Sequence, residues 1–220
     1  MALLLWSGGC DSTLLLHDML TAAPDADGNR VGRYVKLKPI EPIRVLSINH
    51  DQITNSKQGS LARKRLWPKL KKLRGFTYSE TTVAINDIGV ENGDGGLCQP
   101  GIWLLHAAMC LSADEDLYAG YIRTDDIWHR REQLYGAFGW LQAMTEKTGR
   151  LLCPLEWMRK GEVIQELERL RLLKDTWHCE DPTDKHKPCG KCASCDTHAM
   201  GLVWLERQAS LLVPDETKKK

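Results

Sequence analysis

A run of glycine and polar residues that could bind phosphate follows the first apolar segment of the chain. Residues 3–6 read LLLW, and residues 7–13 read SGGCDST. A strand, a glycine turn and a helix start in this order would aim free backbone N–H groups and the positive end of a helix dipole at one point. Gly8 and Gly9 permit positive φ and a close backbone approach to a ligand. Asp11 is suited to hold Mg²⁺ beside a polyphosphate. We call residues 7–13 the phosphate loop.

Two simpler interpretations of the phosphate loop are a common glycine turn and a helix capped by Ser12. The whole pattern after a hydrophobic strand is more specific than either. It lacks the Gly-Lys-Ser/Thr end of the Walker loop, which disfavours a P-loop NTPase. SGGCDST resembles the pyrophosphate loop of the PP-loop ATP pyrophosphatases. That resemblance implies cleavage of ATP between the α and β phosphates, with adenylylation of a carboxylate or a nucleobase oxygen.

Four of the eight cysteines are clustered near the C-terminus, at Cys179, Cys189, Cys192 and Cys195. A structural Zn²⁺ site takes four such ligands in a tetrahedron, and two-residue spacers let neighbouring cysteines surround one ion. Free buried thiols are a weaker explanation of this spacing. An iron–sulfur cluster also takes four thiolates, but the spacing differs from the ferredoxin patterns. The cluster therefore predicts a zinc site.

Size and composition indicate a single domain with a small appendage. The chain has 220 residues, 42% of them hydrophobic, and a net charge of +1, so its overall charge indicates neither nucleic-acid nor membrane binding. Its apolar stretches are too short to span a bilayer. Met1 leads directly into the first predicted strand, which leaves no room for a signal peptide. We therefore expect a cytoplasmic protein with reduced thiols.

The elements that must position these residues follow an alternating pattern. After the first strand and helix, a loop is expected at about 22–42. Further strands are expected at 43–48, 77–85, 117–121 and 151–154, and further helices at 57–74, 102–111, 131–147, from Lys160 onward and at 196–210. This alternation predicts an α/β fold with a doubly wound, mainly parallel five-stranded sheet. We expect an ATP-binding domain at 1–175, a zinc-binding segment with a closing helix at 176–210, and a disordered tail at 211–220.

Residues 57–74 carry eight basic residues and no acidic one. The expected helix is interrupted near Pro68 and turns Leu61, Leu66, Leu70 and Leu73 inward. A solvated face is the usual meaning of such a run, and a surface that binds phosphate or RNA is the alternative.

Taken together, the two terminal motifs resemble those of the 7-cyano-7-deazaguanine synthase family. Four segments between them fit that family more loosely: LSINHDQ at 46–52, GYIRTD at 120–125, PLEWMRK at 154–160 and TWHC at 176–179. The resemblance implies the adenine-nucleotide α-hydrolase-like type of sheet, and a homodimer. It also implies ATP-dependent conversion of 7-carboxy-7-deazaguanine and ammonia to the amide and then to the nitrile, with release of AMP and pyrophosphate.

The resemblance also implies roles for individual residues. Asp11, Ser12 and Lys160 are expected to take part in catalysis, Asp11 through Mg²⁺ and Lys160 by neutralising charge on the phosphates. Asp125 and Trp177 are expected to contact the deazaguanine, Trp177 by stacking. Lys160 as a solvated helix-start lysine and Trp177 as a core aromatic are the alternatives. The residues expected at ATP are Trp6, Ser7, Gly8, Gly9, Cys10, Asp11, Ser12, Thr13, Leu14, Leu15, Leu16, Ser47 and Gln52.

Three segments depart from the family pattern. Asp51 stands where the family has glycine before Gln52, and His50 stands at the preceding aromatic position. Residues 99–101 read QPG where the family has an Arg-Asn pair, and residues 129–131 read HRR where the family has a Tyr-Pro-Asp segment. These regions could shape the acceptor pocket. The open alternatives are a diverged enzyme that amidates or conjugates a deazaguanine, a tRNA-modifying PP-loop enzyme such as a thiolase or lysidine-type ligase, and a zinc-ribbon module that only binds nucleotide.

Overall fold

The computed structural model of the chain describes residues 1–37, 42–50, 55–83, 99–183 and 187–211. Five strands form one sheet in the order β6-β5-β1-β7-β8, and every neighbouring pair is parallel. The strands are β1 (Ala2–Leu5), β5 (Ile43–His50), β6 (Thr77–Val83), β7 (Asp116–Tyr118) and β8 (Leu151–Leu152). The expected doubly wound parallel sheet is confirmed.

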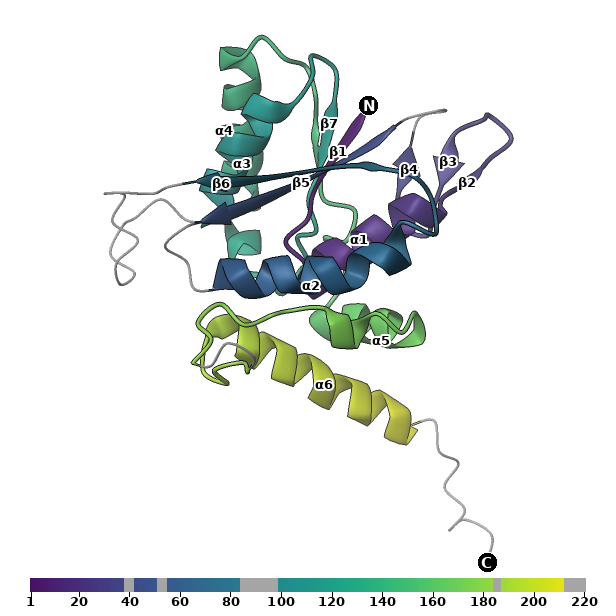
Figure 1. The fold of residues 1–220 in the computed structure, drawn as a ribbon, viewed down its shortest axis with the longest axis vertical. Helices are drawn as coiled ribbons and strands as arrows, with labels where there is room; N and C mark the ends of the chain where they lie inside the picture. The colour runs from purple at the N-terminus through teal and green to yellow at the C-terminus, as the bar shows by residue number, and fades with distance from the viewer. Residues whose placement is uncertain (38–41, 51–54, 84–98, 184–186, 212–220) are drawn as a thin grey trace, which may run out of the picture.

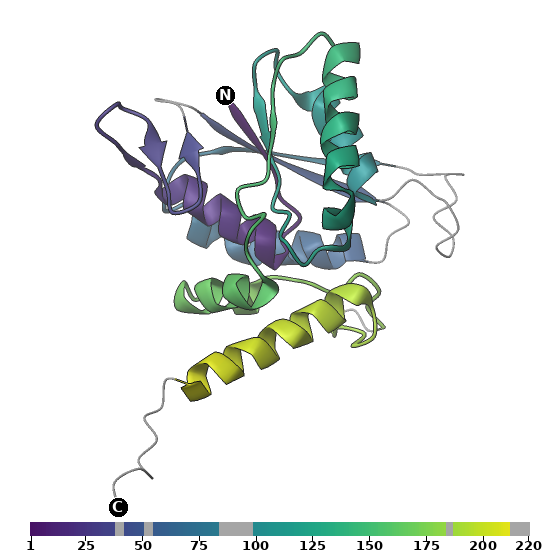
Figure 2. The ribbon, with the colours of Figure 1, turned by 180° about the vertical axis from the view of Figure 1, so that it is seen from behind.

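Within the described residues, six α-helices and two short 3₁₀ helices connect and cover these strands. The α-helices are α1 (Cys10–Thr21), α2 (Asn55–Leu70), α3 (Gln99–Cys110), α4 (Arg131–Met144), α5 (Lys160–Arg169) and α6 (Ala193–Leu211). The 3₁₀ helices are η1 (Asp126–Arg130) and η2 (Leu173–Asp175). Figures 1 and 2 show α3 and α4 on one face of the sheet and α1 and α2 on the other.

Alternate residues of each strand pack into two separate cores. In β1, Leu4 belongs to the core with α1 and α2, whereas Leu3 belongs to the core with α3 and α4. Val45 and Leu46 divide in the same way in β5. Successive side chains of a strand point to opposite faces, and both faces of this sheet are covered by helices. The apolar residues of these strands therefore pack into the two cores, one on each face of the sheet.

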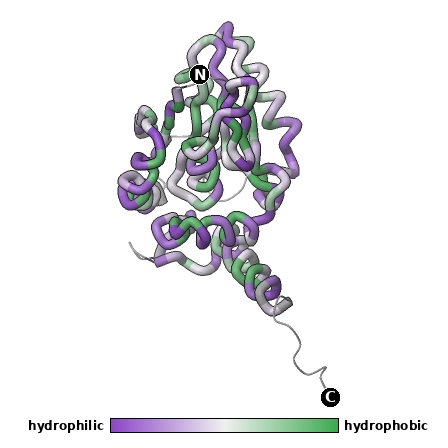
Figure 3. Tube along the Cα trace, turned by 90° about the vertical axis from the view of Figure 1, so that its right-hand side faces the viewer, coloured by the Kyte–Doolittle hydropathy of each residue, from purple (hydrophilic) through white to green (hydrophobic). Residues whose placement is uncertain are grey.

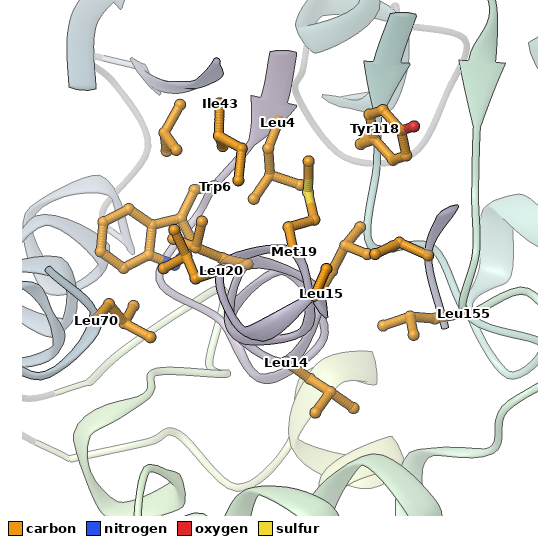
Figure 4. Close-up of a cluster of buried hydrophobic side chains, with 14 of the residues drawn as sticks. Leu4, Trp6, Leu14, Leu15, Met19, Leu20, Ile43, Leu70, Tyr118 and Leu155 are labelled. Carbon is orange, nitrogen blue, oxygen red and sulfur yellow. The ribbon is translucent and has the colours of Figure 1, made fainter. Parts of the chain in front are cut away.

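Helix α1 is buried on more than one side, because the sheet covers it from one side and α5 from another. Leu14, Leu15 and Leu16 are each no more than 2% exposed. In Figure 4, Met19 points toward Leu4 of the sheet, whereas Leu14 points away from it on the opposite side of the helix. The three leucines after the phosphate loop are therefore core residues.

The expected loop at 22–42 is wrong for most of its length. Residues 23–37 form a small antiparallel sheet of β2 (Ala23–Pro24), β3 (Arg30–Val31) and β4 (Lys36–Leu37). The Asp18 carboxylate of α1 accepts hydrogen bonds from the backbone N–H groups of Arg33, Tyr34 and Val35, at 2.7 to 3.0 Å. Strands of two residues are too short to show a hydrophobic period, which is why the sequence pattern did not indicate them.

Helix α2 also differs from its expected form. It continues through Pro68 and ends at Leu70. Leu66 and Leu70 are fully buried as expected, whereas Leu73 is 43% exposed because it follows the end of the helix.

Helices α5 and α6 form an outer layer below α1 and α2 (Figure 1). Helix α6 packs on α5, where a Cβ added at Gly161 would come within 2.3 Å of the Trp204 ring. Figure 3 shows hydrophobic segments gathered inside the sheet-containing body and hydrophilic stretches along its outer sides. Among the described residues, no helix is both long and apolar enough to cross a membrane.

Candidate nucleotide and metal sites

A cavity of about 540 Å³ opens beside the ends of β1, β5 and β7. Open α/β sheets place their ligands at this carboxyl edge of the strands. Ser7, Gly9, Cys10, Asp11 and Ser12 of the phosphate loop line it, together with Trp6, Asn49, Gly120, Asp125, Lys160 and Trp177. The structure thus brings together segments that lie far apart in the sequence.

The phosphate loop is held by its own side chains. Gly8 has a φ of +85°, in the left-handed region, whereas Gly9 is extended at −76° and precedes α1. Of the two glycines, only Gly8 therefore uses the positive φ that both were expected to permit. The Ser7 hydroxyl accepts a hydrogen bond from the Gly9 N–H at 3.1 Å and lies 3.0 Å from the Ser12 hydroxyl. The hydroxyl groups and the start of α1 are consequently adjacent.

Asp11 and Lys160 form an ion pair at this cavity. The Lys160 ammonium donates to Asp11 Oδ2 at 2.5 Å, and the two side chains are 11% and 18% exposed. Burial acts to lower the pKa of Lys160, but the interactions with Asp11, Cys10 and Asp125 together outweigh it, and the pKa is raised. Lys160 is therefore a buried cation, and the alternative of a solvated helix-start lysine is wrong.

The second oxygen of Asp11 is available for another ligand. Asp11 Oδ1 is buried and has no hydrogen-bond partner within the described part of the chain. Buried polar atoms are almost always paired in native proteins, so an unpaired carboxylate oxygen at a cavity calls for a ligand. A hard divalent cation such as Mg²⁺ prefers oxygen ligands of this kind. The donor set therefore fits the expected role of Asp11.

Trp177 connects the phosphate loop to the cysteine cluster. Its backbone N–H donates to the Gly8 carbonyl at 3.1 Å, and its indole N–H donates to the Cys179 carbonyl at 2.7 Å. One residue earlier, the Thr176 hydroxyl lies 3.3 Å from Cys10 Sγ. Trp177 is half-buried and lines the cavity. Its ring is stacked against the His178 ring, with centroids 6.3 Å apart, so the face turned away from His178 is the part that remains for a substrate.

Asp125 also lines the cavity, and it closes the turn before η1. Its Oδ2 accepts a hydrogen bond from the Ile122 N–H at 2.9 Å. The carboxylate is therefore fixed in orientation by its own turn, at the end of the segment that follows β7.

Several residues expected at ATP do not line the cavity. Leu14, Leu15 and Leu16 point into the core, as described above. Thr13 is fully buried, and its hydroxyl accepts a hydrogen bond from the Trp6 indole N–H at 3.1 Å. The Ser47 hydroxyl donates to the Trp6 carbonyl at 2.5 Å and is also buried. The expected contact of these residues with nucleotide is therefore corrected. The three leucines are core residues, and the hydroxyls of Thr13 and Ser47 are already hydrogen-bonded inside the protein. Gln52 lies outside the described residues.

The sequence analysis missed several residues that line the cavity. Arg63 is one, and Trp103 and Tyr121 are others. For Arg63 a signal was present. Arg63, Leu66 and Leu70 follow the i, i+3, i+7 spacing of one helix face, and both leucines are buried. That spacing places Arg63 on the buried face of α2, whereas the neighbouring basic residues Lys64 and Arg65 are exposed.

The four clustered cysteines converge on one point. The Sγ atoms of Cys179, Cys189, Cys192 and Cys195 all lie within 4.8 Å of one another. Cys189 and Cys195 are 3.9 Å apart, and Cys179 and Cys192 are 4.0 Å apart. A tetrahedral zinc with Zn–S bonds of about 2.3 Å requires S···S distances of about 3.8 Å. A four-iron cluster would hold its thiolates farther apart, because each binds a different iron. The geometry fits a single tetrahedral ion.

Backbone N–H groups surround the sulfur atoms. Lys191 and Cys192 donate to Cys189 Sγ at 3.4 and 3.3 Å, and Cys189 donates to Cys179 Sγ at 3.1 Å. Gly190 has a φ of +71°, which the tight turn between Cys189 and Cys192 requires. These hydrogen bonds, led by the one from Lys191, lower the pKa of Cys189 to about 7. Cys189 is thus prepared to bind a metal as a thiolate, whereas burial raises the pKa of Cys179 and of Cys195.

Comparisons with known proteins bear on the C-terminal part of the chain. Residues 130–205 match the family model described as Queuosine biosynthesis protein QueC. A protein of Rhizorhabdus wittichii named 7-cyano-7-deazaguanine synthase is 35% identical over 80 residues, or 33% of this chain and 35% of that protein. The match thus spans about a third of the relative's length. The expected resemblance is confirmed over a region that contains Lys160, Trp177 and the four cysteines.

Solved structures resemble the whole chain at low sequence identity. The U34-tRNA thiolase NcsA from Methanococcus maripaludis, with its [4Fe-4S] cluster, aligns with a TM-score of 0.52 and 15% identity over 99% of this chain and 74% of that one. This likeness supports the fold. NMN synthetase from Francisella tularensis aligns with a TM-score of 0.48 and 11% identity over 97% and 89%, too weakly for any inference. The homodimer and the cytoplasmic location stay predictions.

Proposed function

We propose that this chain is an ATP-dependent carbon–nitrogen ligase of the 7-cyano-7-deazaguanine synthase family. One observation carries the proposal. A single cavity contains the phosphate loop, a buried Asp11–Lys160 pair and the Trp177 ring, although Asp11 and Lys160 are 149 residues apart in the sequence. Such a pair adds little stability by itself, because burying two charges costs about as much as their attraction returns. A site that binds polyphosphate uses both charges.

The proposed reaction adenylylates the substrate twice. A carboxylate oxygen of 7-carboxy-7-deazaguanine attacks the α-phosphorus of ATP, the bond to the β-phosphate oxygen breaks, and pyrophosphate leaves. Ammonia then attacks the acyl carbon, a proton is lost, and AMP leaves to give the amide. The amide oxygen attacks a second ATP with release of pyrophosphate. Loss of AMP and of the two N–H protons leaves the nitrile.

Six of the residues that line the cavity have a proposed task in these steps. Ser7, Gly9 and Ser12 offer hydroxyl and backbone N–H groups to the leaving pyrophosphate beside the start of α1. Lys160 stays protonated and lies where negative charge grows on the phosphates, which is electrostatic stabilisation of the transition state. Mg²⁺, held through Asp11 Oδ1, would neutralise the polyphosphate further. Trp177 supplies an aromatic face for the deazaguanine ring.

The cysteine cluster is proposed to bind a structural zinc ion. When bound, zinc supplies folding energy, because its ligands are not preorganised in the unfolded chain. Residues 176–179 run from the cavity directly into the first zinc ligand. The metal would therefore keep Trp177 against the phosphate loop without contacting substrate.

Mass spectrometry of one reaction mixture tests the proposal. The mixture contains the protein, ATP, Mg²⁺, ammonium and 7-carboxy-7-deazaguanine, and a matched mixture contains the Lys160→Met variant. Appearance of the amide and then the nitrile with the wild-type protein, together with AMP and pyrophosphate, is the expected result. The amide without the nitrile would restrict the activity to amidation. No product and no pyrophosphate from the wild-type protein would overturn the proposal.

A further inference from the structure

Arg63 differs from the other basic residues of α2. Its side chain is 4% exposed, whereas Lys57, Lys64, Arg65 and Lys69 are all exposed. Burial of a guanidinium is costly unless its charge is paired and its N–H groups are hydrogen-bonded. The expected solvated face therefore describes the helix as a whole but not this residue.

Arg63 makes four hydrogen bonds that converge from three parts of the fold. Its Nη1 donates to the Ser7 carbonyl at 2.8 Å, and its Nη2 donates to Asn49 Oδ1 and Glu80 Oε1, both at 2.8 Å. Its Nε donates to the Tyr78 hydroxyl at 3.1 Å, and that hydroxyl donates to Glu80 Oε2 at 2.7 Å. The guanidinium thus ties α2 to β5, β6 and the phosphate loop at once.

The bond to Ser7 determines how the phosphate loop is oriented. In a planar trans peptide the carbonyl and the following N–H point in opposite directions, and the described residues contain no cis peptide. Holding the Ser7 carbonyl against Arg63 therefore turns the Gly8 N–H away from α2. A carbonyl that swung the other way would present negative partial charge to a phosphate.

The backbone of α2 approaches the loop closely at the same place. A Cβ added at Gly8 would lie 2.8 Å from the Gly59 carbonyl oxygen and 3.0 Å from Arg63 Cγ, and one added at Gly59 would lie 2.9 Å from the Ser7 carbonyl oxygen. On the other side, the Trp177 N–H holds the Gly8 carbonyl. The first turn of the loop is thus clamped between α2 and residue 177.

We propose that Arg63 is a positioning residue for the phosphate loop, acting through its bond to the Ser7 carbonyl and oriented by Glu80, Tyr78 and Asn49. This role rests on the proposed use of ATP at that loop. Because Glu80 neutralises its charge, Arg63 works by geometry. A lysine keeps the charge but is a point donor on a flexible stem, so it cannot hold the same three acceptors and the Tyr78 hydroxyl in one plane.

The first test measures the loop itself, without nucleotide. Amide hydrogen exchange at residues 7–13 is compared among the wild-type protein, Arg63→Lys and a matched control, Lys64→Met, whose side chain is exposed on the same helix. Faster exchange in Arg63→Lys at the phosphate loop, with unchanged exchange in β1 and in Lys64→Met, is expected. Unchanged loop exchange in Arg63→Lys would overturn the proposal whether or not the protein uses ATP.

The second test separates positioning from direct phosphate binding. In Arg63→Lys, kcat for pyrophosphate release should fall by about 10-fold or more, because small misplacement of a reacting group is costly, while KM for ATP changes little. A wild-type kcat in Arg63→Lys would show that the positive charge alone matters and would refute the positioning role. Tyr78→Phe, which keeps Arg63 and removes one of its acceptors, should give a smaller loss of kcat and serves if Arg63→Lys does not fold. A wild-type protein without pyrophosphate release would instead refute the proposed function and leave the exchange test intact.

Discussion

At the residue scale, the ion pair between Asp11 and Lys160 explains how two ionisable groups can be buried at the cavity while one oxygen of Asp11 remains available for a ligand. Lys160 takes one oxygen of Asp11 at 2.5 Å, and the other oxygen is unpaired in the described part of the chain. The pair holds both side chains in place before a ligand binds, which lowers the cost of organising the site during the reaction.

Asp11→Asn should nearly abolish ATP turnover. Asparagine keeps the shape of the side chain but removes the charge that pairs Lys160 and attracts a cation, so pyrophosphate release should fall by about 100-fold or more. The circular dichroism spectrum and the content of metal bound by the four cysteines should stay at wild-type values. Asp27→Asn, at an exposed turn position, is the control and should keep full turnover. Wild-type turnover in Asp11→Asn would remove this residue from the proposed chemistry.

The ion pair between Glu80 and Arg63 predicts a pH dependence of stability. Burial acts to raise the pKa of Glu80, but hydrogen bonds from Tyr78 and Asn49 and the charge of Arg63 lower it from 4.5 to about 2. A carboxylate with a lowered folded-state pKa stabilises the protein above its unfolded pKa, and this contribution is lost as pH falls toward the folded value. Glu80 should therefore contribute fully at pH 6 and progressively less between pH 4.5 and 2.

Glu80→Gln tests this dependence by chemical unfolding at pH 6 and at pH 3. The variant should be less stable than the wild-type protein at pH 6, and the difference in free energy of unfolding should shrink at pH 3. Comparing the two proteins at each pH cancels acid effects elsewhere in the chain. An equal difference at both pH values would contradict the assignment.

At the scale of elements, the turn through Gly190 and the start of α6 bring four sulfur atoms together. Cys195 lies in the first turn of α6, and Cys179 follows the segment that contacts the phosphate loop. Metal bound there would link a loop of the outer layer to the cavity through a few residues.

Cys192→Ser should lower metal content and melting temperature together, because metal-binding energy contributes directly to folding energy. Elemental analysis and thermal unfolding of the same sample measure both quantities. Cys110→Ser, at an exposed cysteine of α3, is the matched control and should change neither. Retention of one metal ion per chain in Cys192→Ser would be incompatible with a four-cysteine site.

At the scale of the whole molecule, the outer layer determines where Lys160 sits. Lys160 is the first residue of α5, and Gly161 follows it where α5 and α6 pack closely together. The ring of Trp204 fills the space that a side chain at Gly161 would need, so the position of α5 depends on α6.

Gly161→Ala should therefore reduce both stability and pyrophosphate release. A Cβ at this position would lie 2.3 Å from a ring atom of Trp204, so the helices must separate and Lys160 must shift from Asp11. The control is Gly139→Ala in α4, where nothing lies within 4 Å of the added atom. That change should raise stability by about 0.5–1 kcal/mol through helix propensity. Thermal unfolding and turnover that match wild type in Gly161→Ala would show that α5 does not depend on this contact.

The sequence by itself determined the local features of this protein. Short apolar runs predicted four strands of the main sheet, because a parallel sheet covered on both faces needs continuous apolar strands. The Thr, Val and Tyr content of residues 77–85 predicted β6. The glycines and hydroxyl residues at 7–13 predicted a turn before a helix, and the spacing of the last four cysteines predicted a group of metal ligands. These features depend on residues close together in the chain, so short patterns are sufficient to recognise them.

Only the tertiary structure decided which distant residues meet. Asp11 pairs with Lys160, Arg63 supports Ser7, and Trp177 holds Gly8, because α2, α5 and the segment before the cysteines all pack against the end of β1. Burial of Leu14 to Leu16 likewise depends on α5 covering α1 from outside the sheet. In a basic run, a solvated arginine and a buried, hydrogen-bonded arginine have the same local sequence pattern. After a glycine turn, the same is true of a leucine that contacts a ligand and a leucine that packs in the core. The partner that it meets distinguishes these roles, and long-range packing selects that partner.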